Sequence, residues 1–157
     1  SKDGGDTWEN ITAKLGLLWP AGFDLDPRNP TVMYLTANAS PTAPSQGGLY
    51  KTTTDGTSWQ QVFSLSKLPG EERAVPLRCW FVSVSPHKSD NVYLSTQDHG
   101  VYLSQDNGIS WSRLEWVPCR SVTRVCFPPL DRTSVYVSTL GGGVWRGPAA
   151  PQKSEAD

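Results

Sequence analysis

The stretch Ser104–Trp111, SQDNGISW, decides the fold because related stretches occur at two other places in the chain. One is Ser1–Trp8, SKDGGDTW, and both follow the pattern Ser-x-Asp-x-Gly-x-Thr/Ser-Trp. The other is Thr52–Trp59, TTTDGTSW, a degenerate copy in which threonines replace the serine and the aspartate, and Asp55 is displaced by one position. The terminal tryptophans are 51 and 52 residues apart, and a period of about this size indicates a repeat architecture.

Other features recur in register with this eight-residue box. A Gly-x-Tyr step precedes each of the two later boxes, at residues 48–50 and 100–102, and residues 143–145 form a Gly-x-Trp version with no box after it. Further upstream, a tyrosine follows a proline by seven residues three times, at Tyr34, Tyr93 and Tyr136. Constant spacing in three units indicates true repeats.

Each unit contains four short segments of strand character. The first alternates apolar residues and ends near a proline, the second carries the Val-Tyr or Met-Tyr pair, the third is the Gly-x-Tyr step, and the fourth follows the boxed tryptophan. Fourteen glycines and 13 prolines suit many tight turns, and no segment has helical periodicity. The pattern predicts an all-β fold, because four strands in about 50 residues are typical of a β-propeller blade.

The box supplies turn chemistry between the third and fourth strands. Its glycine can adopt positive φ, its Ser and Asp side chains can accept hydrogen bonds from backbone amides, and its tryptophan offers a large apolar face. We therefore interpret the box as a structural element. The residues assigned to it are Ser1, Asp3, Gly5, Thr7, Trp8, Thr52, Asp55, Gly56, Ser58, Trp59, Ser104, Asp106, Gly108, Ser110 and Trp111.

On these residues the chain resembles Asp-box (BNR) repeat β-propellers, and the resemblance covers residues 1–147. The units look most similar to those of sialidase, xyloglucanase-type and sortilin-type propellers, a group that contains enzymes, receptors and assembly factors. The resemblance implies a glycoside-hydrolase-like scaffold whose boxes lie on the face away from the substrate, and it favours a secreted or periplasmic location. Fold alone does not choose a function.

The repeat divides the chain into unequal parts. Residues 1–18 hold a box and the fourth strand of a preceding or partner blade, residues 19–66 and 67–118 are blades, residues 119–147 hold three strands of a last blade, and residues 148–157 are predicted to be a disordered tail. The two ends are complementary. Joining Arg146 to Ser1 restores the Tyr102–Trp111 pattern without a gap.

About three blades cannot close a ring, since propellers typically have four to eight. Two arrangements remain open: a fragment of a larger propeller, or two copies that form a six-bladed ring, each donating its N-terminal strand to the last blade of the other. Ser1 is neither an initiator methionine nor part of a signal-like sequence, which favours a piece of a longer protein.

Composition argues against several kinds of partner. A net charge of −1 with scattered Lys and Arg lacks the basic surface that nucleic acid requires. No apolar run reaches the roughly 18 residues needed to span a bilayer. Three cysteines without paired spacing indicate free thiols, neither a zinc site nor a disulfide framework, and we expect no metal and no cofactor.

The resemblance places ligands at the loops after the second and fourth strands of each unit. The catalytic candidates there are Asp98, His99 and Glu115, and the ligand-binding candidates are Trp80, Trp116, Arg78 and Arg120. Glycoside hydrolysis needs two carboxylates about 5 to 9.5 Å apart, and Asp98 with Glu115 or Glu71 could supply them. Each candidate also has a structural interpretation: solvated carboxylates, a turn histidine, tryptophans buried between blades, and arginines paired with glutamates.

The sequence predicts a non-catalytic binding or scaffold portion of a glycoside-hydrolase-like propeller, which could recognise carbohydrate. The alternative is part of a glycoside hydrolase whose site is completed by missing blades or by a second chain. A third reading is an interaction scaffold without affinity for sugars.

Overall fold

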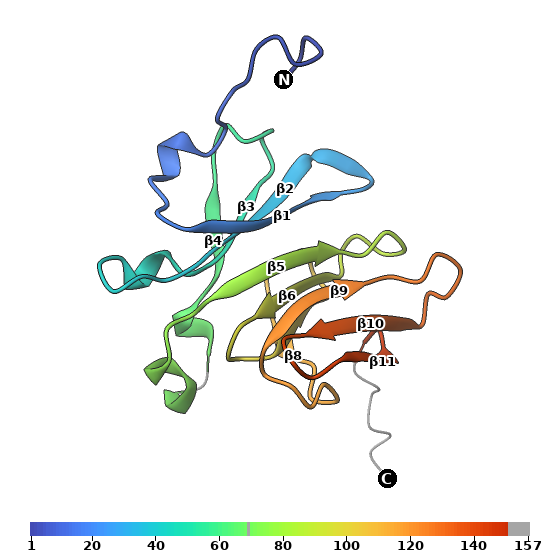
Figure 1. The fold of residues 1–157 in the computed structure, drawn as a ribbon. Coiled ribbons are helices and arrows are strands. Elements are labelled where there is room, and N and C mark those ends of the chain that lie inside the picture. The colour runs from blue at the N-terminus through green and yellow to red at the C-terminus, as the bar shows by residue number, and fades with distance from the viewer. Residues whose placement is uncertain (69, 151–157) are drawn as a thin grey trace.

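The computed structural model describes residues 1–68 and 70–150, and within them the strands form three antiparallel sheets (Figure 1). The first sheet contains β1 (Pro20–Asp26), β2 (Asn29–Ala37), β3 (Gly48–Thr52) and β4 (Gln60–Ser64), in that order. The second contains β5 (Cys79–Val84), β6 (Val92–Thr96), β7 (Val101–Ser104) and β8 (Ser112–Arg113), in that order. The third contains β9 (Val122–Cys126), β10 (Ser134–Thr139) and β11 (Val144–Pro148), with β10 in the centre.

The prediction of an all-β fold of about three blades is confirmed, with four strands in the first two sheets and three in the last. The helices found among the described residues are short 3-10 turns, namely Ala13–Leu15, Pro44–Gln46, Leu65–Lys67 and Gly70–Ala74. Within this part of the chain, no helix is long and apolar enough to cross a membrane.

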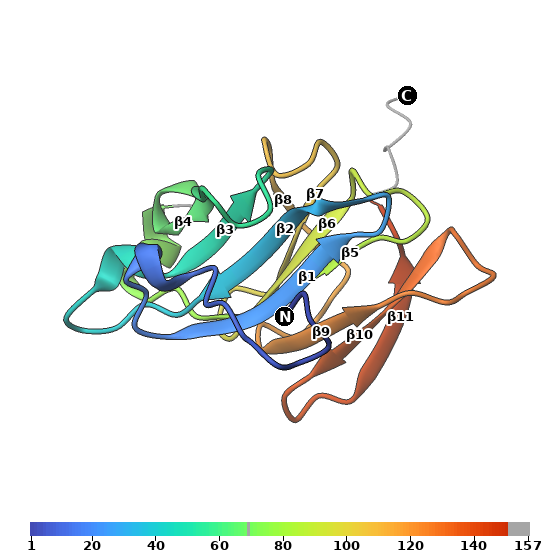
Figure 2. The same ribbon diagram turned by 90° about the horizontal axis from the view of Figure 1, so that it is seen from above.

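The three sheets lie side by side through their first strands. β5 packs between β1 and β9, as Figure 1 shows, and in the view from above the first sheet lies over the second, with the third sheet to one side (Figure 2). Radial packing about a row of first strands is the arrangement of propeller blades.

The hydrophobic cores lie between neighbouring sheets. One cluster joins Tyr34, Leu49 and Phe63 of the first sheet to apolar residues of the second, including Val82 and Val92. A second cluster joins β6, β7 and Leu114 to the valines of the third sheet. Because the side chains of a strand alternate between its two faces, the second sheet contributes to both clusters and is buried on both sides.

The third and fourth strands pair in the same register in both complete sheets. Lys51 opposes Gln60 in the first sheet, and Leu103 opposes Ser112 in the second. In each case the residue directly after the boxed tryptophan opposes the residue eight positions before that tryptophan. The box therefore sets the register of its hairpin.

The two ends of the chain differ from the repeating units. Residues 1–18 contain a box turn and one 3-10 turn, so the fourth strand expected there stays a prediction that depends on a neighbouring strand to pair with. Pro148 ends β11, and the Ala149 amide donates to the Thr133 carbonyl (2.8 Å). The remainder of the expected tail, residues 151–157, lies outside the described residues.

Candidate functional site

The box turns satisfy their own polar groups. In the last copy the Ser104 hydroxyl accepts a hydrogen bond from the Gly108 amide (2.7 Å), and the Asp106 carboxylate accepts from the Ser110 amide (2.9 Å) and hydroxyl (2.5 Å). The Trp111 indole N–H donates to the Gly108 carbonyl (3.1 Å). Asp106 is thus fully engaged in holding a turn.

The first copy repeats this network. The Gly5 amide donates to the Ser1 hydroxyl (2.7 Å), and the Thr7 amide and hydroxyl donate to the Asp3 carboxylate (2.9 and 2.6 Å). Hydrogen bonds of this kind stabilise the ionised carboxylate and lower its pKa. The Thr7 hydroxyl is the main cause that lowers the pKa of Asp3 from 3.8 to about 2, and the Ser110 hydroxyl does the same for Asp106.

The degenerate copy forms the same turn with hydroxyls alone. The Gly56 amide donates to the Thr52 hydroxyl (3.2 Å), and the Ser58 amide donates to the Thr54 hydroxyl (3.0 Å). Asp55 occupies the following position, where its φ is +52°, as Asn107 (+60°) and Gly4 (+74°) do in the other copies. This position takes the left-handed conformation, which Gly, Asn and Asp adopt most readily.

The box turns lie at one end of the sheets, together with the turns that follow the first strands. We call this end the box face. The Asn107 amide donates to the Asp90 carbonyl (3.0 Å), and the Asn107 side chain donates to the Asp90 carboxylate (2.8 Å). The Arg28 guanidinium from the first sheet reaches Ser89 (2.6 Å) of the second. The Asn107 bonds join two turns of the second sheet, and the Arg28 bond joins turns of the first and second sheets.

The loops after the second and fourth strands gather at the opposite end, which we call the loop face. The Gln97 amide donates to the Arg78 carbonyl (2.9 Å), and the Gly100 amide donates to the Arg120 carbonyl (2.7 Å). Residues 97–100 therefore lie between the two arginines. The structure thus brings four sequence candidates together, namely Arg78, Asp98, His99 and Arg120.

A pocket of about 230 Å³ opens on this face beside residues 97–100. The described residues that line it are His99, Gly100, Arg113, Leu114, Glu115, Val117, Pro118, Cys119 and Arg120. Three sequence candidates thus share one hollow, whereas Asp98 is outside this lining. The side chain of Glu71, the other proposed carboxylate partner, lies outside the described part of the structure.

Glu115 is held in a two-pronged ion pair. Arg113 donates from Nε to the carboxylate oxygens of Glu115 (3.0 and 3.1 Å) and from Nη2 to Oε2 (2.8 Å). Hydrogen bonding by Arg113, supported by the charges of Arg113 and Arg120, lowers the pKa of Glu115 below its ordinary value. A general acid needs a raised pKa, so this environment suits an ionised structural or ligand-orienting carboxylate better than a proton donor.

His99 is almost fully buried, and its backbone amide donates to the Thr96 hydroxyl (3.0 Å). It therefore helps to build the turn before Gly100, whose φ is +80°.

The two candidate tryptophans occupy different surroundings. Trp80 is 39% exposed near the loop-face end of β5, two residues after the exposed Arg78. Trp116 is partly buried, and its ring covers Gly147 so closely that an added Cβ there would lie 2.6 Å from the ring atoms. Trp80 therefore presents an accessible aromatic surface, whereas Trp116 joins the loop after β8 to β11.

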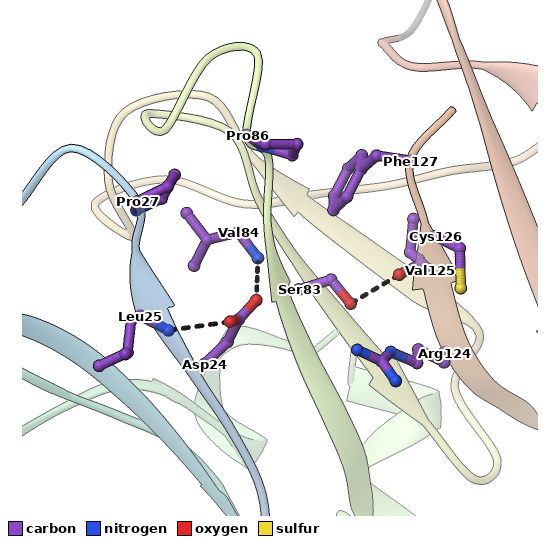
Figure 3. Close-up of a pocket in the computed structure, with 10 residues that line it drawn as sticks. All are labelled: Asp24, Leu25, Pro27, Ser83, Val84, Pro86, Arg124, Val125, Cys126 and Phe127. Carbon is purple, nitrogen blue, oxygen red and sulfur yellow. Dashed lines mark hydrogen bonds between the residues drawn. The ribbon is translucent and has the colours of Figure 1, made fainter. Parts of the chain in front are cut away.

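A second hollow, of about 320 Å³, runs along the first strands (Figure 3). The Asp24 carboxylate on β1 accepts from the Val84 amide on β5 (2.8 Å), and the Ser83 hydroxyl on β5 donates to the Val125 carbonyl on β9 (2.8 Å). The Arg124 guanidinium stacks over the Phe81 ring at 4.4 Å from its centroid. Polar side chains thus link each first strand to the next.

Sequence reasoning missed this inner groove. A partial signal was present, because Asp24 and Ser83 are the polar middle residues of the first two first-strand segments, where the third segment has Cys126. A polar residue at the same place in successive repeats indicates a shared environment, here the wall that faces the centre of the row of sheets.

The cysteines are free thiols: Cys79 is buried, Cys119 partly buried and Cys126 exposed. Burial raises the pKa of the Cys79 thiol well above its ordinary value. Among residues 1–68 and 70–150, no three or more His, Cys, Asp or Glu side chains form a group that could hold a metal ion.

Comparison with known proteins gives both a sequence relative and structural neighbours. No protein-family model matches the chain. Xyloglucanase Xgh74A of Acetivibrio thermocellus is 26% identical over 125 residues, which cover 76% of this chain. The match spans only 14% of the length of that relative, so the chain resembles a small part of a much larger protein.

Several solved structures share the fold. The GH74 enzyme of Niastella koreensis superposes with a TM-score of 0.63 at 21% identity, covering 82% of this chain and 21% of that one. The GH74 xyloglucanase of Xanthomonas campestris gives 0.60 at 16% identity, with coverages of 86% and 23%, and YCF48 of Cyanidioschyzon merolae gives 0.55 at 19%, with 82% and 33%. The chain is therefore a section of a β-propeller, similar in fold to part of the GH74 propellers.

Proposed function

We propose that this chain is a non-catalytic, carbohydrate-binding part of a glycoside-hydrolase-like propeller with Asp-box repeats. The observation that carries the proposal is the accessible Trp80 beside Arg78 on the loop face of a fold that is similar to xyloglucanase propellers. An exposed aromatic ring can stack on the apolar face of a sugar, and arginine can donate several hydrogen bonds to its hydroxyl oxygens.

The arrangement of the carboxylates supports a binding role over a catalytic one. Asp3 and Asp106 are engaged in box turns on the opposite face, and Glu115 is paired with Arg113. We propose that Arg78, Arg120 and Trp80 contact the ligand, while Trp116 supports the loop that carries Arg120. The same similarity supports a secreted or periplasmic location, which a signal sequence at the start of the parent gene would bear out.

Calorimetric titration with a xyloglucan oligosaccharide tests the proposal. Trp80→Ala should weaken binding about fivefold or more, taking as a guide the roughly 1 to 3 kcal/mol that the stacking of a nucleic-acid base on an aromatic side chain contributes. Arg120→Ala should weaken binding less, because its hydrogen bonds are exchanged for those of water.

Matched controls lie on the box face. Ile109→Ala removes an exposed apolar side chain in a box turn, and Arg132→Ala removes an arginine from the turn after β9; both should leave the affinity unchanged. Absence of binding to sugars, or equal losses in the controls, would rule out carbohydrate recognition at the loop face and favour a scaffold without affinity for sugars.

The alternative, a portion of a glycoside hydrolase, is favoured by one observation: His99 and Glu115 line the same pocket. In that case further blades or a second chain would complete the site, with Asp98, His99 or Glu115 in a catalytic role. Measurable release of sugar from xyloglucan that is abolished by Glu115→Gln, but not by Asp106→Asn, would establish this alternative.

A further inference from the structure

The two ends of the row of sheets expose faces that are buried elsewhere in the repeat. Tyr34 and Tyr93 are fully buried against the following sheet, whereas the equivalent Tyr136 is 39% exposed. Val82 is fully buried against the preceding sheet, whereas the equivalent Phe23 is 41% exposed. The first and third sheets therefore each present an apolar face shaped for a neighbouring blade.

The third sheet also has an open edge at β11. Val101 and Tyr102 lie on β7 beside β8, and both are buried. Their equivalents on β11 are Val144, which is 70% exposed, and Trp145, which is 42% exposed. An exposed edge strand with apolar side chains is a template for another strand.

The N-terminal segment already lies where the outer strand of a preceding blade would lie. Val62, three residues after the box of the first sheet, packs on Gly108 of the next box at 3.4 Å from the position of an added Cβ. Ile11, three residues after the first box, packs on Gly56 in the same way at 2.9 Å, and the Trp59 indole donates to the Ile11 carbonyl (3.2 Å).

We propose that β11 of one copy pairs with residues Trp8–Thr12 of a second copy, so that each copy completes the last blade of the other. The register follows from the two complete sheets: Glu9 would oppose Arg146, and Asn10 would oppose Trp145. Arg146 already pairs with Asp131 (3.0 Å), and Glu9 would add a second carboxylate beside the same guanidinium, an opposite charge across the two strands. The inference rests on the fold alone and is independent of carbohydrate binding.

Within one copy, the two segments of the proposed pair lie at opposite ends of the row of sheets. Residues 1–12 lie at the end of the row formed by the first sheet, and β11 lies at the other end (Figure 1). A single copy cannot bring them together without breaking the packing between sheets. Two copies related by a two-fold axis supply six blades, within the usual range of four to eight for a closed ring.

The open edge can be blocked by one substitution. The Leu114 amide donates to the Val101 carbonyl (2.9 Å), so the equivalent Val144 directs its amide and carbonyl toward the open edge. Proline lacks the amide, and it is tolerated on edge strands. Val144→Pro should therefore prevent another strand from pairing with the open edge of β11 and leave the β10–β11 pairing in place.

Light scattering coupled to gel filtration measures the assembly. The 157-residue chain should have about twice its 17.2 kDa mass, and Val144→Pro should have the single mass. Leu130→Pro is the matched control, because Leu130 is 98% exposed in a turn of the same sheet away from the edge, and this variant should remain a dimer. A monomeric wild-type chain, an open-ended series of larger species, or a Val144→Pro dimer would overturn the proposal.

A cysteine pair tests the register without relying on the proline variant. A chain with Asn10→Cys and Trp145→Cys should form a disulfide-linked dimer on mild oxidation, because the two residues are expected to face each other across the new strand pair. Asn10→Cys with Leu130→Cys should give no such dimer above the background of the native thiols. Equal cross-linking of both pairs would also overturn the proposal.

Discussion

At the scale of the residue, the degenerate box shows which positions of the repeat are constrained and why. Thr54 replaces the carboxylate of Asp3 and Asp106 but keeps the hydrogen bond to the amide four residues on. Asp55 occupies the left-handed position of its turn, as Asn107 does in the last copy. The sequence predicted the turn role of the box, but the left-handed conformation at its fourth position emerged only from the backbone.

Asp106→Ala should cost about 2 kcal/mol in the free energy of unfolding, because the change removes the acceptor of four hydrogen bonds in the turn. Asp55→Ala should cost about 0.5 kcal/mol, since alanine adopts positive φ somewhat less readily than aspartate. Urea denaturation of both variants measures the difference. Equal or reversed losses would contradict the assigned alignment of the boxes.

The lowered pKa of Asp106 also predicts a dependence on pH. A carboxylate with a folded pKa of about 2 and an ordinary value of 3.8 contributes stability that is present above about pH 4 and is lost as the pH falls through 2. The stability difference between the wild-type chain and Asp106→Asn should therefore shrink between pH 5 and pH 2. A difference that stays constant over this range would show that the folded turn does not stabilise the ionised Asp106 carboxylate over its protonated form.

At the scale of the element, the strands could be predicted from the constant spacing of the repeats. The contacts between sheets could not. The Val-Tyr and Gly-x-Tyr segments became β2, β3, β6, β7, β10 and β11 because β-branched and aromatic residues suit a buried pleated surface. The tie from Asp24 to the Val84 amide joins residues 60 positions apart, and no local pattern specifies it.

Gly22 marks the closest approach of β1 to β5. An added Cβ at this position would lie 2.6 Å from the Phe81 Cα and 2.7 Å from the Trp80 carbonyl oxygen, both backbone atoms that cannot rotate away. Gly22→Ala should therefore destabilise the fold by about 2 to 3 kcal/mol through overpacking between two blades.

Gly70→Ala is the matched control for Gly22→Ala, because a Cβ at Gly70 meets no atom within 4 Å. It should leave the unfolding free energy within about 0.5 kcal/mol of the wild-type value, as surface changes do. Chemical denaturation compares the two variants. A Gly22→Ala loss no larger than that of Gly70→Ala would mean that β1 and β5 are not in tight contact.

At the scale of the whole molecule, the box turns and the loops that we propose to bind ligand lie at opposite ends of the sheets. Box turns and the turns after the first strands form the box face, and the loops that carry Arg78, His99 and Arg120 form the loop face. The sequence predicted this division through the resemblance of its repeats. The inner groove beside Arg124 was missed, because the matching positions of the repeats mark its wall only once the three first strands are placed side by side.

One measurement tests the division of faces most directly: amide chemical shifts of the isotope-labelled chain during titration with a xyloglucan oligosaccharide. The account predicts shifts at residues 78–80, 97–100 and 115–121, and unchanged signals at the three boxes, residues 1–8, 52–59 and 104–111. Shifts concentrated in the boxes, or no shift on the loop face at saturating sugar, would contradict it.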